Sequence, residues 1–298
     1  VFSVCAKSWL SSIPVLYAFV LSENHLGSSL FFVDVMGSAA FLFFIAVVVV
    51  GLLPVLESGF GVLTDMTLME YMDPSSELLR RFAMEVPGTY QHSLVLGHLA
   101  EISAQAIGAN GLFCRVATLY HDIGKMNNPQ FYTENQQEAV NIHQLLTPLE
   151  SAQVIISHVT DGVAIAQKFR LPEPFINIIR EHHGTTLVYY FYRKELERKG
   201  GRKEEVDESL FRYPGPKPRT KESAIIMICD SIEATSRSLD EVGEKSITEM
   251  VDRLVKEKAE DGQFTECQLT FEELSRLKKV IVKTLLLSHH VRVKYPKR

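Results

Sequence analysis

The sequence predicts an all-α protein in which one or two transmembrane helices precede a soluble helical bundle. An apolar run near the amino terminus exceeds the roughly 18 residues that suggest a membrane span. Through the rest of the chain, apolar residues recur at spacings of three and four, and glycine or proline ends most of these stretches. The sequence has no long alternating pattern of the kind that indicates strands, no internal repeat and no glycine-rich phosphate loop.

Residues 28–56 contain the strongest candidate for a membrane span. The stretch carries a single charge, at Asp34, and a buried helix of a soluble core rarely lacks polar residues for so long. The earlier segment SWLSSIPVLYAFVL is interrupted by Pro14 and is either the end of another span or a re-entrant segment. We therefore assign residues 1–57 to a transmembrane region. Because the chain begins at Val1 and becomes apolar almost at once, we expect this region to be the last part of a longer polytopic protein.

Residues 58–86 are predicted to form a polar connector, and residues 87–298 a soluble domain. In the connector, Asp73 followed by Pro74 predicts the start of a helix, with a capping side chain and a proline in the first turn. Residues 193–221 interrupt the helical pattern with a highly charged stretch and a proline-rich loop. Helices are predicted over TYQHSLVLGHLAEISAQAI, LFCRVATLYHD, SAQVIISHVTDGVAIAQKF, LPEPFINIIREHH, AIIMICDSIEATSRSL and TFEELSRLKKVIVKTLL, the last of which opens with the capping-box spacing of Thr270 and Glu273.

Charge and cysteine content exclude some classes of function. The net charge of −5 argues against a protein that binds nucleic acid polymers through a basic surface, although it allows a local basic pocket for a small phosphorylated ligand. The four cysteines are far apart and form no CxxC pair, so neither a thiolate zinc site nor a disulfide framework is indicated. A reducing compartment fits this cysteine usage.

The histidines and aspartates of the soluble domain are the residues that indicate chemistry. His158 alone would more often be a core histidine with a hydrogen-bond partner, and Asp230 alone would fit a buried carboxylate. As a set, however, five histidines and two aspartates suit two divalent metals held about 3.5 to 4 Å apart in a helical bundle. Two such cations would activate a water and clamp oxygens on phosphorus, so the predicted reaction class is phosphoester hydrolysis. The set consists of His92, His121, Asp122, His158, His182, His183 and Asp230.

Several longer motifs resemble one family of proteins. In order along the chain, VPGTYQHS, YHDIGK, PQFYTEN, HHGT, FRYPGPKP and DSIEATSR are similar to motifs of the PgpH-type 7TM-HD family, membrane-anchored HD-domain phosphodiesterases of cyclic di-AMP. The resemblance extends over almost all of residues 52–298. It implies an all-α HD domain and a multi-pass protein of the inner (plasma) membrane with its catalytic domain in the cytoplasm. A cyclic dinucleotide and the lipid bilayer would be its partners, and the sequence leaves a homo-oligomer open.

The resemblance also implies an arrangement of ligands. One metal would be held by His92, His121, Asp122 and Asp230, and the second by His158, His182 and His183, with Asp122 as the bridge. The metals would be manganese or iron, and a hydroxide held between them would attack phosphorus, giving the linear dinucleotide pApA. His121, Asp122 and Lys125 are the expected catalytic residues.

Six residues are candidates for binding substrate. Lys125 would contact a phosphate, or else be a cation placed favourably at a helix end. Thr185 would bond a phosphate oxygen or cap the next segment. The remaining four would form a positively charged wall or an aromatic platform for adenine, or else a solvated loop fixed by prolines; they are Arg212, Tyr213, Lys217 and Arg219.

Two other functions compete with this interpretation. An HD phosphohydrolase could act on another nucleotide, such as cyclic di-GMP, a 2′,3′-cyclic phosphate or a guanosine polyphosphate, although the GYP signature of cyclic di-GMP enzymes is not reproduced by RYPGP. A membrane receptor could instead bind a nucleotide without hydrolysing it. The loss of a metal ligand would favour such a receptor, and all seven ligand positions are filled.

Overall fold

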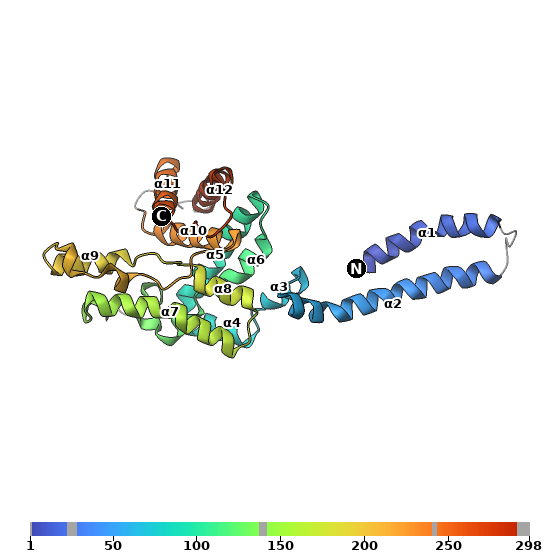
Figure 1. Cartoon of the computed structure of the whole chain (residues 1–298), viewed down its shortest axis with the longest axis horizontal. Helices are drawn as coiled ribbons and strands as arrows, with labels where there is room; N and C mark the ends of the chain where they lie inside the picture. The colour runs from blue at the N-terminus through green and yellow to red at the C-terminus, as the bar shows by residue number, and fades with distance from the viewer. Residues whose placement is uncertain (1, 23–28, 137–141, 240–242, 291–298) are drawn as a thin grey trace, which may run out of the picture. The chain divides into compact units, whose positions relative to one another are not determined.

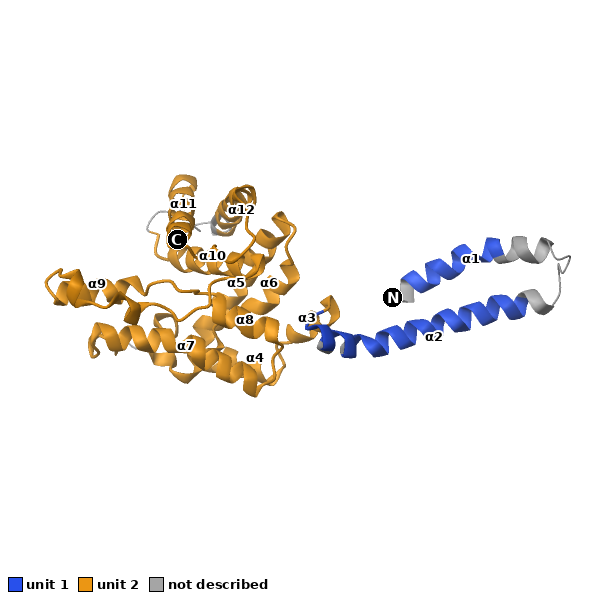
Figure 2. Ribbon diagram, in the orientation of Figure 1, with its two compact units in different colours: residues 1–63 blue, residues 64–298 orange. Residues whose placement is uncertain are grey.

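A computed structural model describes residues 2–22, 29–136, 142–239 and 243–290. The chain divides into two compact units, residues 1–63 and residues 64–298 (Figure 2). In the described residues every regular element is an α-helix or a short 3₁₀-helix, and the β-structure is one isolated bridge between Leu187 and Arg212. The predicted all-α fold is therefore confirmed. The unit boundary lies inside the predicted connector, whereas the finer division at residues 57 and 86 stays a prediction.

The first unit consists of α1 (Phe2–Ser22) and α2 (Ser29–Phe60). Within it, the indole Nε1 of Trp9 donates to the carbonyl of Val35 at 3.3 Å and to Ser38 Oγ at 3.2 Å. Pro14 does not interrupt α1, which continues through it. In the described part of the chain, residues 32–57 of α2 form the one helical stretch that has the length and composition needed to cross a membrane.

The second unit is a helical domain. Its α-helices are α3 (Asp65–Tyr71), α4 (Glu77–Glu85), α5 (Pro87–Ala106), α6 (Gly111–Thr118), α7 (Pro148–Lys168), α8 (Glu173–Glu181), α9 (Tyr189–Arg198), α10 (Lys221–Ser236), α11 (Glu244–Glu260) and α12 (Phe271–His290) (Figure 1). Its 3₁₀-helices are η1 (Ile123–Asn127), η2 (Pro129–Phe131), η3 (Thr133–Asn135), η4 (Ile142–Gln144), η5 (Lys203–Glu205) and η6 (Glu208–Phe211).

Three boundaries differ from the sequence prediction. Asp73 does not start a helix: its Oδ1 accepts from the backbone N–H of Ser75 in a turn, and α4 begins only at Glu77. The helix before YHDIGK ends at Thr118, so the histidine and aspartate of that motif lie in a turn rather than at a helix end. The charged stretch that was expected to interrupt the helical pattern from residue 193 instead begins inside α9, which starts at Tyr189, continues to Arg198 and buries Phe191 and Tyr192.

Helix α10 lies at the centre of the domain. Its residues from Ser223 to Asp230 are all buried, and helices α5, α6, α8 and α11 pack against it. A helix that is apolar on most sides is typical of a protein core. Because α10 is buried in this way, the carboxylate of Asp230 lies in the interior of the domain. Capping boxes fix the starts of two other helices, at Thr147 and Glu150 for α7 and, as predicted, at Thr270 and Glu273 for α12.

Candidate metal centre

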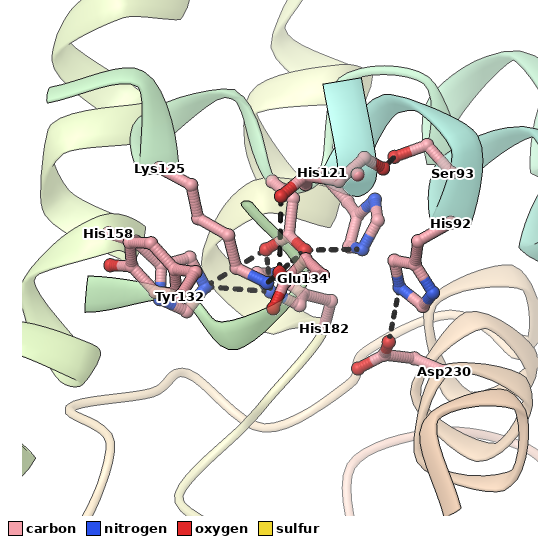
Figure 3. Close-up of polar contacts among 12 residues, drawn as sticks. His92, Ser93, His121, Lys125, Tyr132, Glu134, His158, His182 and Asp230 are labelled. Atoms are coloured by element: carbon pink, nitrogen blue, oxygen red, sulfur yellow. Dashed lines mark hydrogen bonds and ion pairs between the residues drawn. The ribbon is translucent and has the colours of Figure 1, made fainter. Parts of the chain in front are cut away.

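The seven predicted ligand residues come from five segments that converge inside the second unit. His92 lies on α5, His158 in the middle of α7, and Asp230 on α10. His121 and Asp122 lie in the turn between α6 and η1, and the pair His182 and His183 follows α8. Figure 3 shows His92, His121, His158, His182 and Asp230 around one centre. All seven side chains are buried or nearly so, with His183 the most accessible.

The ligand atoms form two groups. In each group they all lie within 4.8 Å of one another, which is close enough for a single ion to contact them together. His92 Nε2 lies 3.0 Å from Asp230 Oδ1 in the first group. In the second group Asp122 Oδ1 lies 3.2 Å from His158 Nε2 and 3.7 Å from His182 Nε2. The first group is His92, His121 and Asp230, and the second is Asp122, His158, His182 and His183.

Asp122 also joins the two groups. Its Oδ2 lies 3.2 Å from Nε2 of His121, a member of the first group, while its Oδ1 faces the second group. One carboxylate can therefore offer an oxygen to each side, which is the geometry that a bridging ligand requires.

Backbone carbonyls fix the orientation of three of the imidazole rings. The Nδ1 atoms of His121, His158 and His182 lie 2.7, 2.6 and 2.8 Å from the carbonyl oxygens of the residues three positions earlier, Thr118, Ile155 and Ile179. A carbonyl can only accept, so each Nδ1 must carry the proton and each Nε2 must present its lone pair to the centre. This hydrogen bond from the non-ligating nitrogen is typical of metal-binding histidines.

Two observations show that these lone pairs need a cation. The Nε2 atoms of His158 and His182 lie 3.2 Å apart although both are then acceptors. His121 Nε2 and Asp122 Oδ1 are buried and have no hydrogen-bond partner among the described residues. Buried polar atoms without partners are costly, and divalent metals coordinated by imidazole and carboxylate would satisfy all four. The residues therefore fit a pair of divalent metal ions, as the sequence predicted.

Burial keeps the second group ready to bind metal. Desolvation lowers the pKa of His182, and it lowers the pKa of His183 well below its usual value with help from the neighbouring rings of His182 and His158. Neutral imidazole is the form that ligates metal. Burial acts to raise the pKa of Asp122, but its interactions with His121, Lys125 and His158 outweigh burial and hold that pKa well below the usual range, so the carboxylate stays ionised.

Lys125 lies at the edge of the centre and holds two carboxylates. Its Nζ lies 2.8 Å from Asp122 Oδ2 and 3.0 Å from Glu134 Oε1, and 5.0 Å from the centroid of the Tyr132 ring. Burial opposes the charge, but Asp122 and Glu134 together raise the pKa of Lys125. Figure 3 shows the lysine side chain directed at this cluster. Lys125 therefore lies in the last turn of η1 and is also a charged residue of the site.

Two acidic residues of the site were not predicted. Glu233 Oε2 lies 2.5 Å from His92 Nδ1. It therefore fixes the orientation of the His92 ring, as the backbone carbonyls fix the rings of His121, His158 and His182. Its position three residues after Asp230 on the same helix was a usable signal, because residues so spaced share a face. Glu134 accepts hydrogen bonds from Lys125 Nζ and from Thr89 Oγ1. Thr89 and Glu134 are 45 residues apart, so their contact forms only in the folded chain and could not be read from the sequence.

The other predicted substrate residues divide between two places. Tyr213 lies in the site, where its ring stacks on His183 with centroids 4.3 Å apart. The remaining four have partners elsewhere and do not line the cavity at the metal centre: Arg212 pairs with Glu208 and Asp261, Arg219 with Glu181, Lys217 contacts Thr265, and Thr185 bonds Gln263. The expected positive wall is therefore not found among them.

A cavity of about 540 Å³ opens over the metal centre. That size is typical of sites for small ligands. Ligand residues line its floor, Tyr132, Ile155 and Tyr213 supply apolar surface, and Lys125 and Arg237 supply positive charge.

The helical fold and the paired His and Asp clusters define a class of protein, the HD-domain proteins. In agreement, the family model for the HD domain matches residues 89–235. Within that class, the chain belongs to the PgpH family, as its resemblance in sequence predicted. It is 45% identical to the PgpH HD domain of L. monocytogenes, crystallised in complex with cyclic-di-AMP, with a TM-score of 0.68, and the match covers 72% of this chain and 98% of that one.

Two curated relatives agree with this assignment. The chain is 43% identical over 84% of its length to the cyclic-di-AMP phosphodiesterase PgpH of Bacillus subtilis, and 44% identical over 83% to the protein of that name from Listeria monocytogenes. The matched regions are 35% and 34% of those proteins, so the chain spans about a third of the length of these relatives.

Proposed function

We propose that this chain is a metal-dependent phosphodiesterase that hydrolyses cyclic di-AMP to linear pApA. The observation that carries the proposal is the pair of ligand groups joined by Asp122 beneath an open cavity. The relationship to an HD domain crystallised with cyclic-di-AMP supports the choice of substrate. We further propose that the metals are manganese or iron, held by His92, His121, Asp122 and Asp230 on one side and by Asp122, His158, His182 and His183 on the other.

Bound metals would supply a Lewis acid and lower the pKa of water, which is the chemistry that phosphodiester cleavage needs. The chain's own residues prepare the site for this. Carbonyls and Glu233 hold four imidazole rings with Nε2 inward, so little reorganisation is needed when charge develops on the phosphate. Lys125 lines the cavity and is fixed by Asp122 and Glu134, which supports a role for its ammonium as a contact for a phosphate oxygen. Tyr132 and Ile155 cover apolar parts of a ligand and exclude water.

We propose that the chain is anchored in the plasma membrane, with residues 64–298 in the cytoplasm. Helix α2 supports anchoring because its large side chains face outward: Phe41, Phe43 and Phe44 are each 63% exposed, which is unfavourable in water and favourable in lipid. Cyclic dinucleotides are made and used in the cytoplasm, so the metal centre should face that side. Protease accessibility of residues 64–298 in spheroplasts tests the orientation, and cleavage from outside would contradict it.

A direct assay tests the activity. The purified chain, loaded with manganese or with iron and checked for metal content, is incubated separately with cyclic di-AMP and cyclic di-GMP, and the products are identified by chromatography. We expect pApA from cyclic di-AMP. Preferential hydrolysis of cyclic di-GMP would assign another nucleotide to the site, and tight binding without turnover would indicate a receptor.

Variants locate the activity in the metal centre. His121→Ala and Asp122→Ala should abolish hydrolysis while circular dichroism still shows a helical fold, because each removes a ligand atom that the rest of the site cannot replace. Hydrolysis that survives in both variants, with metal absent from the centre, would show that the activity lies elsewhere.

A further inference from the structure

His183 differs from the other histidines of the metal centre in what holds its ring. Among the residues that the structure describes, no group hydrogen-bonds the His183 imidazole: its Nδ1 lies 3.8 Å from Asp230 Oδ2, which is too far for a hydrogen bond. The rings of the other four histidine ligands each have such a partner. The place of the His183 ring therefore depends on the backbone that carries it.

That backbone continues from His183 into a tight turn, residues 184–186. Gly184 has a φ of +54°, and a Cβ at this position would lie 2.3 Å from Gln263 Oε1. Gln263 comes from the loop between α11 and α12, 78 residues after Thr185, and it is fully buried. A buried glutamine amide needs hydrogen-bond partners, and Gln263 finds two of them in this turn.

Gln263 holds both the backbone and the side chain of Thr185. Its Oε1 accepts from the Thr185 backbone N–H at 3.0 Å, and its Nε2 donates to Thr185 Oγ1, also at 3.0 Å. The Thr185 carbonyl in turn accepts from Arg212 Nη1 at 2.8 Å. Every polar group of Thr185 is therefore bound by a side chain from a later segment, only two positions after the ligand His183.

Asp261 fixes the direction of the Gln263 amide. Its Oδ2 accepts from Gln263 Nε2 at 2.8 Å, and its Oδ1 accepts from Arg212 Nη2 at 3.1 Å. A carboxylate can only accept, so the amide nitrogen must face Asp261 and Oε1 must face the Thr185 N–H. Gln263, Asp261, Arg212 and Thr185 thus form one hydrogen-bonded network, and a network whose members are satisfied makes the backbone that it binds rigid.

We propose that Gln263 is a positioning residue for the second group of metal ligands: it holds the turn after His183 and thereby keeps that imidazole directed at the metal centre. The inference deepens the proposed function and rests on its metal centre, which it extends to the loop between α11 and α12. The first group depends less on Gln263, since His92 and Asp230 lie within α5 and α10. Loss of the Gln263 amide should therefore weaken the binding of one metal more than that of the other.

Stepwise metal affinities test the proposal. The full chain, purified in detergent, is titrated with Mn²⁺ in competition with a fluorescent chelator, and His183→Ala identifies the binding step that belongs to the second group. Gln263→Met, which has a similar size but no amide, should weaken that same step by roughly 10- to 100-fold and leave the other step within about twofold. Gln268→Met is the matched control, because Gln268 is exposed in the same loop, and both of its steps should equal those of the unsubstituted chain.

A second pair of variants keeps the hydrogen bonds but reverses one of them. Gln263→Glu places a carboxylate beside that of Asp261 and should weaken the second-group step. Adding Asp261→Asn should restore most of the affinity, because the new amide can donate to the new carboxylate, which still accepts from the N–H and the hydroxyl of Thr185. A side chain that only fills space would show no such recovery. This pair tests the proposal even if Gln263→Met does not fold.

The outcomes separate this inference from the proposed function. If Gln263→Met weakens both steps equally or neither of them, or if the double variant binds as weakly as Gln263→Glu, the positioning role is wrong, whether or not the chain hydrolyses cyclic di-AMP. If the selective loss and the recovery are seen in a chain that does not hydrolyse cyclic di-AMP, the positioning role stands and the proposed function fails. If the unsubstituted chain shows no second Mn²⁺ step, both fail.

Discussion

His92 lies between two carboxylates of helix α10, with Glu233 Oε2 2.5 Å from its Nδ1 and Asp230 on its Nε2 side. Burial opposes protonation of His92, but the two carboxylates raise its pKa to about 10 in the metal-free protein. A metal that binds Nε2 therefore displaces a proton, and Glu233 keeps the remaining N–H oriented.

Glu233→Ala should weaken metal binding by about 10- to 100-fold, because His92 loses the partner that fixes its ring. Glu233→Gln should lose less, since the amide oxygen still accepts from Nδ1. Competition with a fluorescent chelator measures both affinities. Glu249→Ala, at an exposed position on α11, is the control and should match the unsubstituted chain. Unchanged affinity in Glu233→Ala would show that the backbone alone holds His92.

Variants of Lys125 can distinguish a structural role of this residue from a role in binding substrate. Residues 64–298 form their own compact unit, and its free energy of unfolding can be followed in urea without metal. Lys125→Met should cost about 3 kcal/mol, because Asp122 and Glu134 lose their shared cation in a largely buried site. Adding Glu134→Gln should recover part of that stability by removing one unpaired charge.

The same double variant then reports on phosphate binding. If Lys125 contacts substrate, Lys125→Met with Glu134→Gln should remain poorly active although its stability has partly returned. Recovery of activity along with stability would show that Lys125 serves only to neutralise the carboxylates.

The sequence was sufficient to predict the fold class because the helical period and the glycine and proline stops are local signals. It was also sufficient to select the seven ligand candidates, because histidines and aspartates that have ordinary explanations singly indicate a metal site as a set. Their distances could not be predicted, because the segments carrying His92 and Asp230 meet only in the folded chain, 138 residues apart.

Charged residues were harder to assign. Arg212 and Arg219 were predicted to belong to a positively charged wall of the site, but they pair with Asp261 and Glu181, which are 49 and 38 residues away. The sequence prediction did not select Glu134 or Glu233 as residues of the site. An acidic or basic side chain has the same local appearance in both roles, so only the tertiary contacts distinguish a residue of the site from half of a distant ion pair.

Glu273 gives a prediction about pH. Its hydrogen bond from Lys221, together with those from Thr270, lowers its pKa to about 2, below the usual value of 4.5. The unfolded state therefore binds more protons between those values, and the stabilisation by Glu273 is present above pH 4.5 and lost as the pH falls toward 2. Glu273→Gln should be less stable than the unsubstituted domain at pH 7, and the difference should shrink steadily below pH 4.5.

Urea unfolding of residues 64–298 across this pH range measures that difference. Glu272→Gln is the control: its side chain is exposed and its ion-pair partner is Arg276 on the same helix, so its effect should be small at every pH. A stability difference for Glu273→Gln that stays constant down to pH 3 would rule out the ion pair as its source.

Gly124 explains why the turn after His121 and Asp122 can lie so close to α7. A Cβ at this position would lie 1.9 Å from the carbonyl oxygen of His158 and 2.5 Å from the backbone nitrogen of Gly162. Neither backbone atom can yield as a flexible side chain could. The glycine therefore lets η1 contact α7, and that contact brings Asp122 Oδ1 to 3.2 Å from His158 Nε2.

Gly124→Ala should separate η1 from α7 and damage folding and metal binding together. We expect a loss of about 3 kcal/mol in the free energy of unfolding, as for a strongly overpacked core site, and reduced metal content because Asp122 moves away from His158. Gly243→Ala is the control, since its nearest neighbour would be Ser246 Oγ at 3.8 Å. Urea unfolding and metal analysis of both variants test this. If Gly124→Ala keeps full stability and two bound metals, the turn can reach His158 without a glycine at this position. The close approach of the turn to α7 would then not be what positions Asp122.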